Sequence, residues 1–83
     1  MKTLVLGCGL KKPLGSIGID INPAAMADII HDLNAVPYPL KNDQFDLIIC
    51  HDILEHLDNI IPSMQEIHRI GKHGACVDII CVH

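Results

Sequence analysis

The segment TLVLGCG, residues 3–9, is a short apolar stretch that ends in two glycines separated by one residue. Thr3–Leu6 is rich in branched aliphatic side chains, which favours a strand, and Gly7-Cys8-Gly9 favours a tight turn directly after it. A second apolar stretch, residues 17–21, carries a single acid, Asp20, near its end. This order of strand, glycine turn and acid-tipped strand is typical of the α/β class.

Further apolar stretches extend the same alternation along the chain. Residues 28–31, 45–50 and 75–82 are expected to be strands, and the run at 45–50 is of the kind that a parallel sheet buries on both faces. Asp58 or Asn59 is placed to cap a helix that ends at Ile70, before Gly71 and Gly74. A shorter helical turn is expected from residue 51 or 52 to residue 57. We therefore expect a Rossmann-like, open, mainly parallel sheet of five strands in the order 3-2-1-4-5.

The connection between the first two strands is unusually short. Only residues 7–16 separate them, and they include Pro13 and Gly15. A parallel crossover normally takes a dozen or more residues and a helix. Either the first crossover helix is missing, or something irregular joins the two strands, and an antiparallel pairing would contradict the expected strand order.

Composition limits the classes of protein that this chain can represent. A chain of 83 residues allows one domain, residues 1–83. The net charge of −4, with no basic cluster beyond Lys11-Lys12, argues against nucleic acid as a partner of this fragment alone. The apolar runs are far shorter than the ~20 residues that cross a membrane. The four cysteines mostly lie in apolar runs, which favours reduced thiols and a cytoplasmic protein.

The two glycines and Asp20 suggest a nucleoside site. Glycine lets the backbone approach a ligand closely, and a carboxylate at a strand tip can accept two hydrogen bonds from a ribose diol. The dinucleotide fingerprint requires a third glycine, but Lys12 occupies that position. NAD is therefore disfavoured as the ligand.

A metal site is a weaker interpretation of the six histidines and four cysteines. His51, Glu55 and His56 come near a zinc protease motif, but their order and spacing do not match it. On a helix, positions 51 and 56 would lie about 140° apart and would not share a face. We expect no metal.

Seven short motifs, taken together, make the sequence resemble a known family. They occur in register from the first strand to the predicted helix: Leu6-Gly7-Cys8-Gly9, Ile19-Asp20-Ile21, His31-Asp32-Leu33, Pro37-Tyr38-Pro39-Leu40, Asp43-Gln44-Phe45-Asp46, His51-Asp52-Ile53-Leu54-Glu55-His56-Leu57 and Glu66-Ile67-His68-Arg69-Ile70. With them the chain resembles class I S-adenosylmethionine-dependent methyltransferases of the type 11-like branch. It resembles a truncated form, with a shortened first crossover and without the two last strands of that family.

The resemblance implies a cofactor, S-adenosylmethionine, and a set of binding residues. Gly7 and Gly9 would line its methionine end, with Cys8 between them. Asp20, followed by Ile21, would hold the ribose hydroxyls. Two departures weaken the match: Val5 stands where the family often has an acid, and Lys11 where it often has a third glycine.

The resemblance also places residues at the two other ends of the cofactor. Asp32 would accept a hydrogen bond from the adenine amine, and Leu33 would meet the ring. His51 would face the sulfonium and the substrate. No catalytic residue can be named, because methyl transfer is an in-line displacement in which a general base is optional.

The expected function is S-adenosylmethionine-dependent methyl transfer to an acceptor that the sequence does not identify. The alternative is a non-catalytic methyltransferase-like remnant that acts as a nucleoside-binding or protein-interaction module. The fifth strand should leave one edge unpaired, with Asp78 as its only charge in residues 76–82. We therefore expect a homodimer joined through or near this strand.

Overall fold

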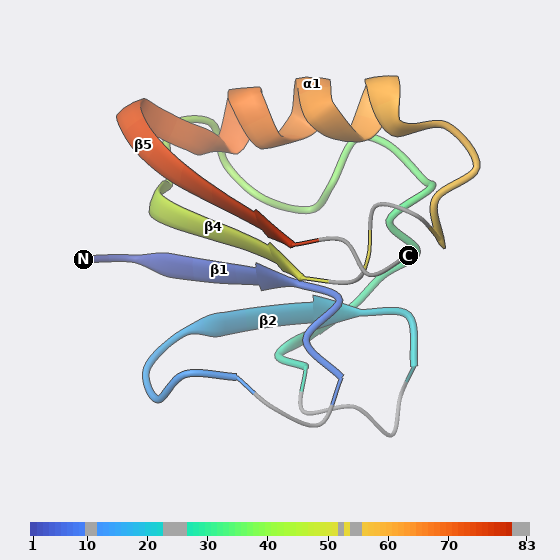
Figure 1. Cartoon of the computed structure of the whole chain (residues 1–83), viewed down its shortest axis with the longest axis horizontal. Coiled ribbons are helices and arrows are strands. Elements are labelled where there is room, and N and C mark those ends of the chain that lie inside the picture. The colour runs from blue at the N-terminus through green and yellow to red at the C-terminus, as the bar shows by residue number, and fades with distance from the viewer. Residues whose placement is uncertain (10–11, 23–26, 52, 54–55, 81–83) are drawn as a thin grey trace.

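The computed structural model describes residues 1–9, 12–22, 27–51, 53 and 56–80. Five strands and one helix follow one another along the chain: β1 (Thr3–Leu6), β2 (Ile17–Asp20), β3 (Ile29–Ile30), β4 (Phe45–His51), α1 (Ile60–Ile70) and β5 (Gly71–Ile80). The strands form one sheet in the order β3-β2-β1-β4-β5, and each neighbouring pair is parallel. Figure 1 shows the labelled arrows side by side and pointing the same way, with α1 running back across the sheet.

The predicted α/β class and strand order are confirmed, whereas several element boundaries differ. β2 ends at Asp20, and β3 is shortened to Ile29–Ile30. β5 begins at Gly71, directly after the helix, and not at residue 75 as predicted. Its first residues form an irregular stretch in which Gly74 has a φ of 83° and the register with β4 shifts. Gly74 therefore allows a bulge inside the strand rather than marking a stop before it.

The predicted helical turn after β4 lies partly outside the described residues. Asp52, Leu54 and Glu55 belong to the part that the structure does not describe. In the remainder, the His56 N–H donates to the Ile53 carbonyl at 3.0 Å, as in a single turn.

Helix α1 forms because its cap and its apolar spacing agree. The Asn59 side chain accepts from the Ile61 N–H at 3.1 Å and so satisfies one of the free amides at the helix start. The buried side chains recur at intervals of three and four residues, which places them on one face: Ser63, Glu66, Ile67 and Ile70. At the other end, the Gly71 N–H donates to the Ile67 carbonyl and closes the last turn.

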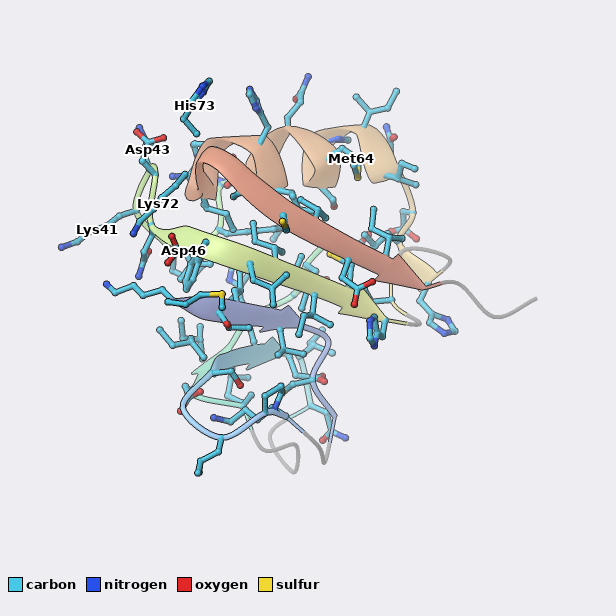
Figure 2. The ribbon with its side chains drawn as sticks, turned by 60° about the vertical axis from the view of Figure 1, so that its left-hand side comes forward. Lys41, Asp43, Asp46, Met64, Lys72 and His73 are labelled. Atoms are coloured by element: carbon cyan, nitrogen blue, oxygen red, sulfur yellow. The ribbon has the colours of Figure 1, made fainter. Side chains whose placement is uncertain are left out.

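The core lies between α1 and one face of the sheet. Paired residues of parallel strands point to the same face, so Leu4 and Ile48 share the face that packs against Ile67 and Ile70. Val5, its partner Ile49 and Asp78 share the opposite face. Among the described residues, α1 is the only helix, and it covers the first face alone (Figures 1 and 2).

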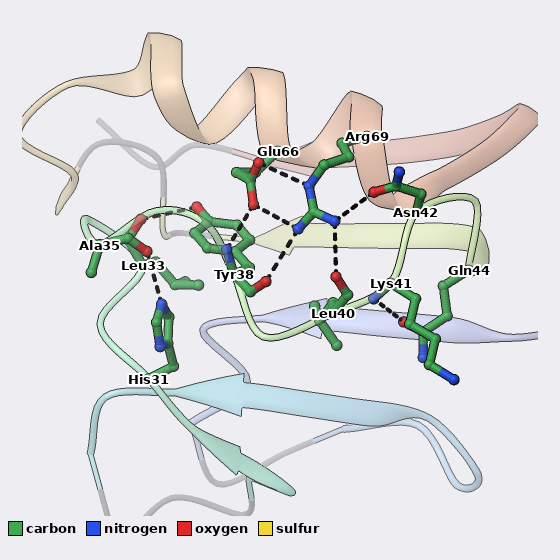
Figure 3. A network of polar contacts seen from close by, with 10 residues as sticks. All are labelled: His31, Leu33, Ala35, Tyr38, Leu40, Lys41, Asn42, Gln44, Glu66 and Arg69. Atoms are coloured by element: carbon green, nitrogen blue, oxygen red, sulfur yellow. Dashed lines mark hydrogen bonds and ion pairs between the residues drawn. The ribbon is translucent and has the colours of Figure 1, made fainter.

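A polar network attaches the long connection before β4 to α1 (Figure 3). Arg69 donates to the Tyr38 and Leu40 carbonyls and forms an ion pair with Glu66 at 2.8 Å. Glu66 also accepts from the Tyr38 N–H at 2.7 Å. The Arg69 side chain lowers the pKa of Glu66 through this hydrogen bonding. The network holds a segment without regular structure firmly against the helix.

Strands β1 and β2 pair in parallel, and the described residues of the connection between them form turns rather than a helix. Lys12 bonds to the Ser16 carbonyl at 2.8 Å and to Asp28 at 3.0 Å. Asp28 in turn accepts from the Gly18 N–H at 2.8 Å; this bond, followed by Lys12, lowers the pKa of Asp28. These contacts tie the short connection to β2. In the described part of the chain, no helix is long and apolar enough to cross a membrane.

Candidate functional site

The carboxyl ends of β1, β2 and β4 meet at one edge of the sheet, where open α/β sheets bind ligands. A cavity of about 550 Å³ opens there on the face opposite α1. Three of the predicted site residues line it, namely Gly7, Cys8 and His51. The rest of its wall comes from the sheet and from the β1–β2 connection: Val5, Ile49, Lys12 and Pro13.

The glycine turn after β1 needs both of its glycines. Gly7 has a φ of 68° and Gly9 a φ of 58°, in the left-handed region that other residues rarely adopt. A side chain at position 7 would meet Ile53 at 2.9 Å, whereas one at position 9 would enter open space. The space beside Gly9 therefore allows a ligand to approach its backbone.

Asp20 is held in place by the glycine turn. One carboxylate oxygen accepts from the Gly9 N–H at 2.9 Å, and the other accepts from the Asn22 N–H at 3.0 Å. Each oxygen has a second lone pair, so the carboxylate can still accept from a ligand. The bond to Gly9 fixes the distance between the glycine turn and the tip of β2. Ile21, the next residue, is 60% exposed.

Asp32 and Leu33 follow β3, and their side chains differ in exposure to solvent. The His31 N–H donates to the Asp20 carbonyl at 2.9 Å, which brings this segment beside β2. Asp32 is exposed and accepts from the Asn34 N–H at 2.9 Å. The Leu33 side chain is buried in the core, so only its backbone can meet a ligand. Its carbonyl accepts from the Tyr38 hydroxyl at 2.9 Å and from the Ser63 hydroxyl at 3.3 Å.

Cys8 lies in the turn with its thiol pointing onto the sheet. A side chain at Gly18 would meet the Cys8 sulfur at 2.7 Å. Burial, followed by the nearby Asp20 charge, raises the pKa of the Cys8 thiol. Cys8 is therefore a protonated packing group in this site and not a thiolate nucleophile. Among the described cysteines, Cys8, Cys50 and Cys76 form no disulfide.

His51, the last residue of β4, contacts a partner that sequence reasoning missed. Its Nε2 lies 3.1 Å from a carboxylate oxygen of Asp78 in β5. The two residues are separated by 27 positions, and no local motif joins them. Gly18 and the Lys12–Asp28 pair were also missed, although a glycine within a strand is a signal of close approach.

The site therefore gathers most of the predicted residues along one edge. Gly7, Cys8 and His51 share a cavity, and Gly9 is bonded to Asp20. Within the described residues, no cluster of three or more His, Cys, Asp or Glu side chains is arranged to hold a metal ion.

A family model described as a methyltransferase domain matches residues 4–77. The chain belongs to the methyltransferase domain family. An uncharacterized protein of Methanocaldococcus jannaschii is 29% identical to this methyltransferase domain over 99 aligned residues. The alignment covers 96% of this chain but 41% of the relative, so the chain spans less than half the length of that protein.

Proposed function

We propose that this domain binds S-adenosylmethionine and transfers its methyl group to an acceptor. One observation carries the proposal: the Gly9 N–H donates to Asp20 at 2.9 Å, which joins the glycine turn of β1 to the acid tip of β2 in a methyltransferase-family domain. That arrangement suits a ligand with a flexible polar tail and a ribose diol.

The residues present fit this cofactor. The open space beside Gly9 would let the methionine end approach the glycine turn, and Asp20 keeps lone pairs for the ribose hydroxyls. The bond from the His31 N–H to the Asp20 carbonyl brings the following residues toward β2, where Asp32 and the Leu33 backbone would meet the adenine. S-adenosylmethionine, when bound, supplies a methyl group already activated for displacement. The protein's part is to align this group with the acceptor and to limit water around it.

The second candidate is a nucleoside-binding or interaction module without catalysis. The bare sheet face opposite α1 favours it, because among the described residues no helix closes the acceptor side of the cavity. Radiolabelled methyl transfer separates the two candidates, because only the first one requires it. An interaction module, unlike the proposed methyltransferase, need not bind a nucleoside.

Calorimetric titration with S-adenosylhomocysteine tests the proposal. Asp20→Ala removes the two-point contact to the diol and the bond to Gly9, whereas Asp32→Ala removes one contact to an amine. A charge-assisted hydrogen bond is worth about 1.5–3 kcal/mol, so we expect Asp20→Ala to weaken binding by roughly tenfold or more, and Asp32→Ala by less.

Asp46→Ala is the matched control, because Asp46 lies near the start of β4, at the opposite end of the sheet. It should leave the affinity unchanged. Absence of binding by the wild-type chain would refute the proposal, and equal losses for Asp20→Ala and Asp46→Ala would remove Asp20 from the site.

A further inference from the structure

His51 and Asp78 form a pair between the neighbouring strands β4 and β5. The Nε2 atom of His51 lies 3.1 Å from Asp78 Oδ2. Both side chains are partly exposed, at 41% and 54%, so the pair does not lie in the core, and its histidine lines the cavity. Asp78 is in register with Ile49, which also lines the cavity, and this places the pair on its face of the sheet.

The carboxylate sets which ring nitrogen carries the proton. Asp78 accepts and cannot donate when ionised, so the Nε2 that faces it holds hydrogen. In the neutral imidazole, Nδ1 then has a free lone pair. A histidine oriented in this way by a carboxylate is a suitable proton acceptor.

The other titratable groups in the cavity wall cannot serve as bases. Lys12 is occupied by the Ser16 carbonyl and by Asp28, and an ammonium has no lone pair. Cys8 is buried, and its pKa is raised, so it keeps its proton. Of the groups that line this cavity, His51 alone offers a neutral nitrogen lone pair.

We propose that His51 is the general base on the acceptor side and that Asp78 is its positioning residue, so that the acceptor is a hydroxyl or an amine that carries a proton. This inference rests on the proposed function. The acceptor atom attacks the methyl carbon as the carbon–sulfur bond breaks and its electron pair passes to sulfur. The acceptor's proton passes to His51 Nδ1, which leaves a methylated acceptor and an imidazolium beside Asp78.

Two ligands that differ only at the reacting position test this assignment by binding. S-adenosylhomocysteine has a neutral thioether there, whereas sinefungin places an ammonium where the methyl group would be. The ammonium can donate to Nδ1 of His51 and is attracted by Asp78. We expect His51→Ala to weaken the binding of sinefungin by about tenfold, which is the value of one charge-assisted hydrogen bond. The same change should weaken the binding of S-adenosylhomocysteine by less than about twofold.

Variants of Asp78 distinguish a role in orienting His51 from a role in stabilising the fold. Asp78→Ala should lower the preference for sinefungin nearly as much as His51→Ala. Asp78→Glu, which keeps the carboxylate, should restore most of it. His73→Ala removes an exposed histidine near the start of β5 and should change neither affinity.

The outcomes distinguish the two proposals. If the wild-type chain binds both ligands and the ratio of affinities does not move in the His51 and Asp78 variants, this inference is wrong and the proposed function stands. Equal losses for both ligands would show a structural role and would also overturn it. A wild-type chain that binds neither ligand overturns the proposed function and this inference together.

Discussion

Gly18 in β2 lies beneath the Cys8 side chain, and its lack of a side chain allows the glycine turn to rest on the sheet. An added Cβ would meet the Cys8 sulfur at 2.7 Å and the Lys12 side chain at 3.0 Å. Both neighbours belong to the β1–β2 connection, which is otherwise held by hydrogen bonds and one ion pair. A single methyl group at this position would therefore push the connection away from β2.

We expect Gly18→Ala to lower the free energy of unfolding by about 1–3 kcal/mol, as overpacking usually does. The clash is mainly with sulfur, so adding Cys8→Ala to Gly18→Ala should recover part of the loss. Urea denaturation of the two single variants and the double variant gives the interaction energy. Simple additivity of the two changes would contradict this account of the packing.

Sequence alone predicted the residues of local motifs and missed the residues that act through contacts distant in the chain. Gly7, Gly9 and Asp20 were predicted because a glycine turn and an acid-tipped strand are local patterns. Asp78 was noticed only as a charge in an apolar strand, since its partner His51 is 27 positions away. Leu33 was predicted as a ligand contact, but its side chain belongs to the core.

Helix α1 and the loop before β4 act as one element because of Glu66 and Arg69. Glu66 is largely buried and accepts from both Arg69 and the Tyr38 N–H. These bonds lower its pKa, with the Arg69 hydrogen bond as the main cause. A carboxylate with a lowered pKa stabilises the fold at pH values above its unfolded pKa, and this contribution is lost as the pH falls through its folded pKa.

We therefore expect wild-type stability to fall on acidification below about pH 4.3, the usual pKa of glutamate. Glu66→Gln should be less stable than wild type at pH 7, by about 1.5–3 kcal/mol, the value of hydrogen bonds to a charged group. The difference between the two proteins should shrink toward pH 3. Thermal or urea unfolding at both pH values measures it, and a difference that stays constant with pH would exclude Glu66 as the source.

The types and the order of the helix and strands were predicted well from the sequence, whereas some of their boundaries were predicted poorly. The cap of α1 was narrowed to Asp58 or Asn59, and Asn59 is the residue that accepts from Ile61. The start of β5 was misplaced because Gly71 and Gly74 resemble a stop signal. In the fold, Phe45 pairs with Gly71 and the bulge at Gly74 follows, so pairing with β4 overrides the local preference.

The β5 side of the molecule has both the outer edge of the described sheet and exposed apolar side chains. β5 is the last strand of the described sheet. Beside it, the large exposed apolar side chains come from α1 and from β5 itself: Ile60, Ile61, Met64, Val77 and Ile79. A second copy related by a two-fold axis would pair the edges and cover these side chains at once.

We expect a homodimer joined along β5, with a mass of twice 9.1 kDa by light scattering at micromolar concentration. The double variant Val77→Lys and Ile79→Lys should shift it to monomer. Ile30→Lys, on the opposite edge strand β3, is the matched control and should leave the mass unchanged. A monomeric wild-type chain at high micromolar concentration would contradict the expectation.

The bond from Gly9 to Asp20 closes a loop of only eleven positions, whereas the His51–Asp78 pair closes one of 27. Loop-closure entropy grows with loop length, and local contacts form early when a chain folds. The two halves of the site therefore differ in how they are assembled. The half proposed to bind a nucleoside is built from residues close together in sequence, whereas the half proposed to accept a proton depends on β5 pairing with β4. Local unfolding of β5 would therefore abolish the proposed methyl transfer and leave the proposed nucleoside binding intact.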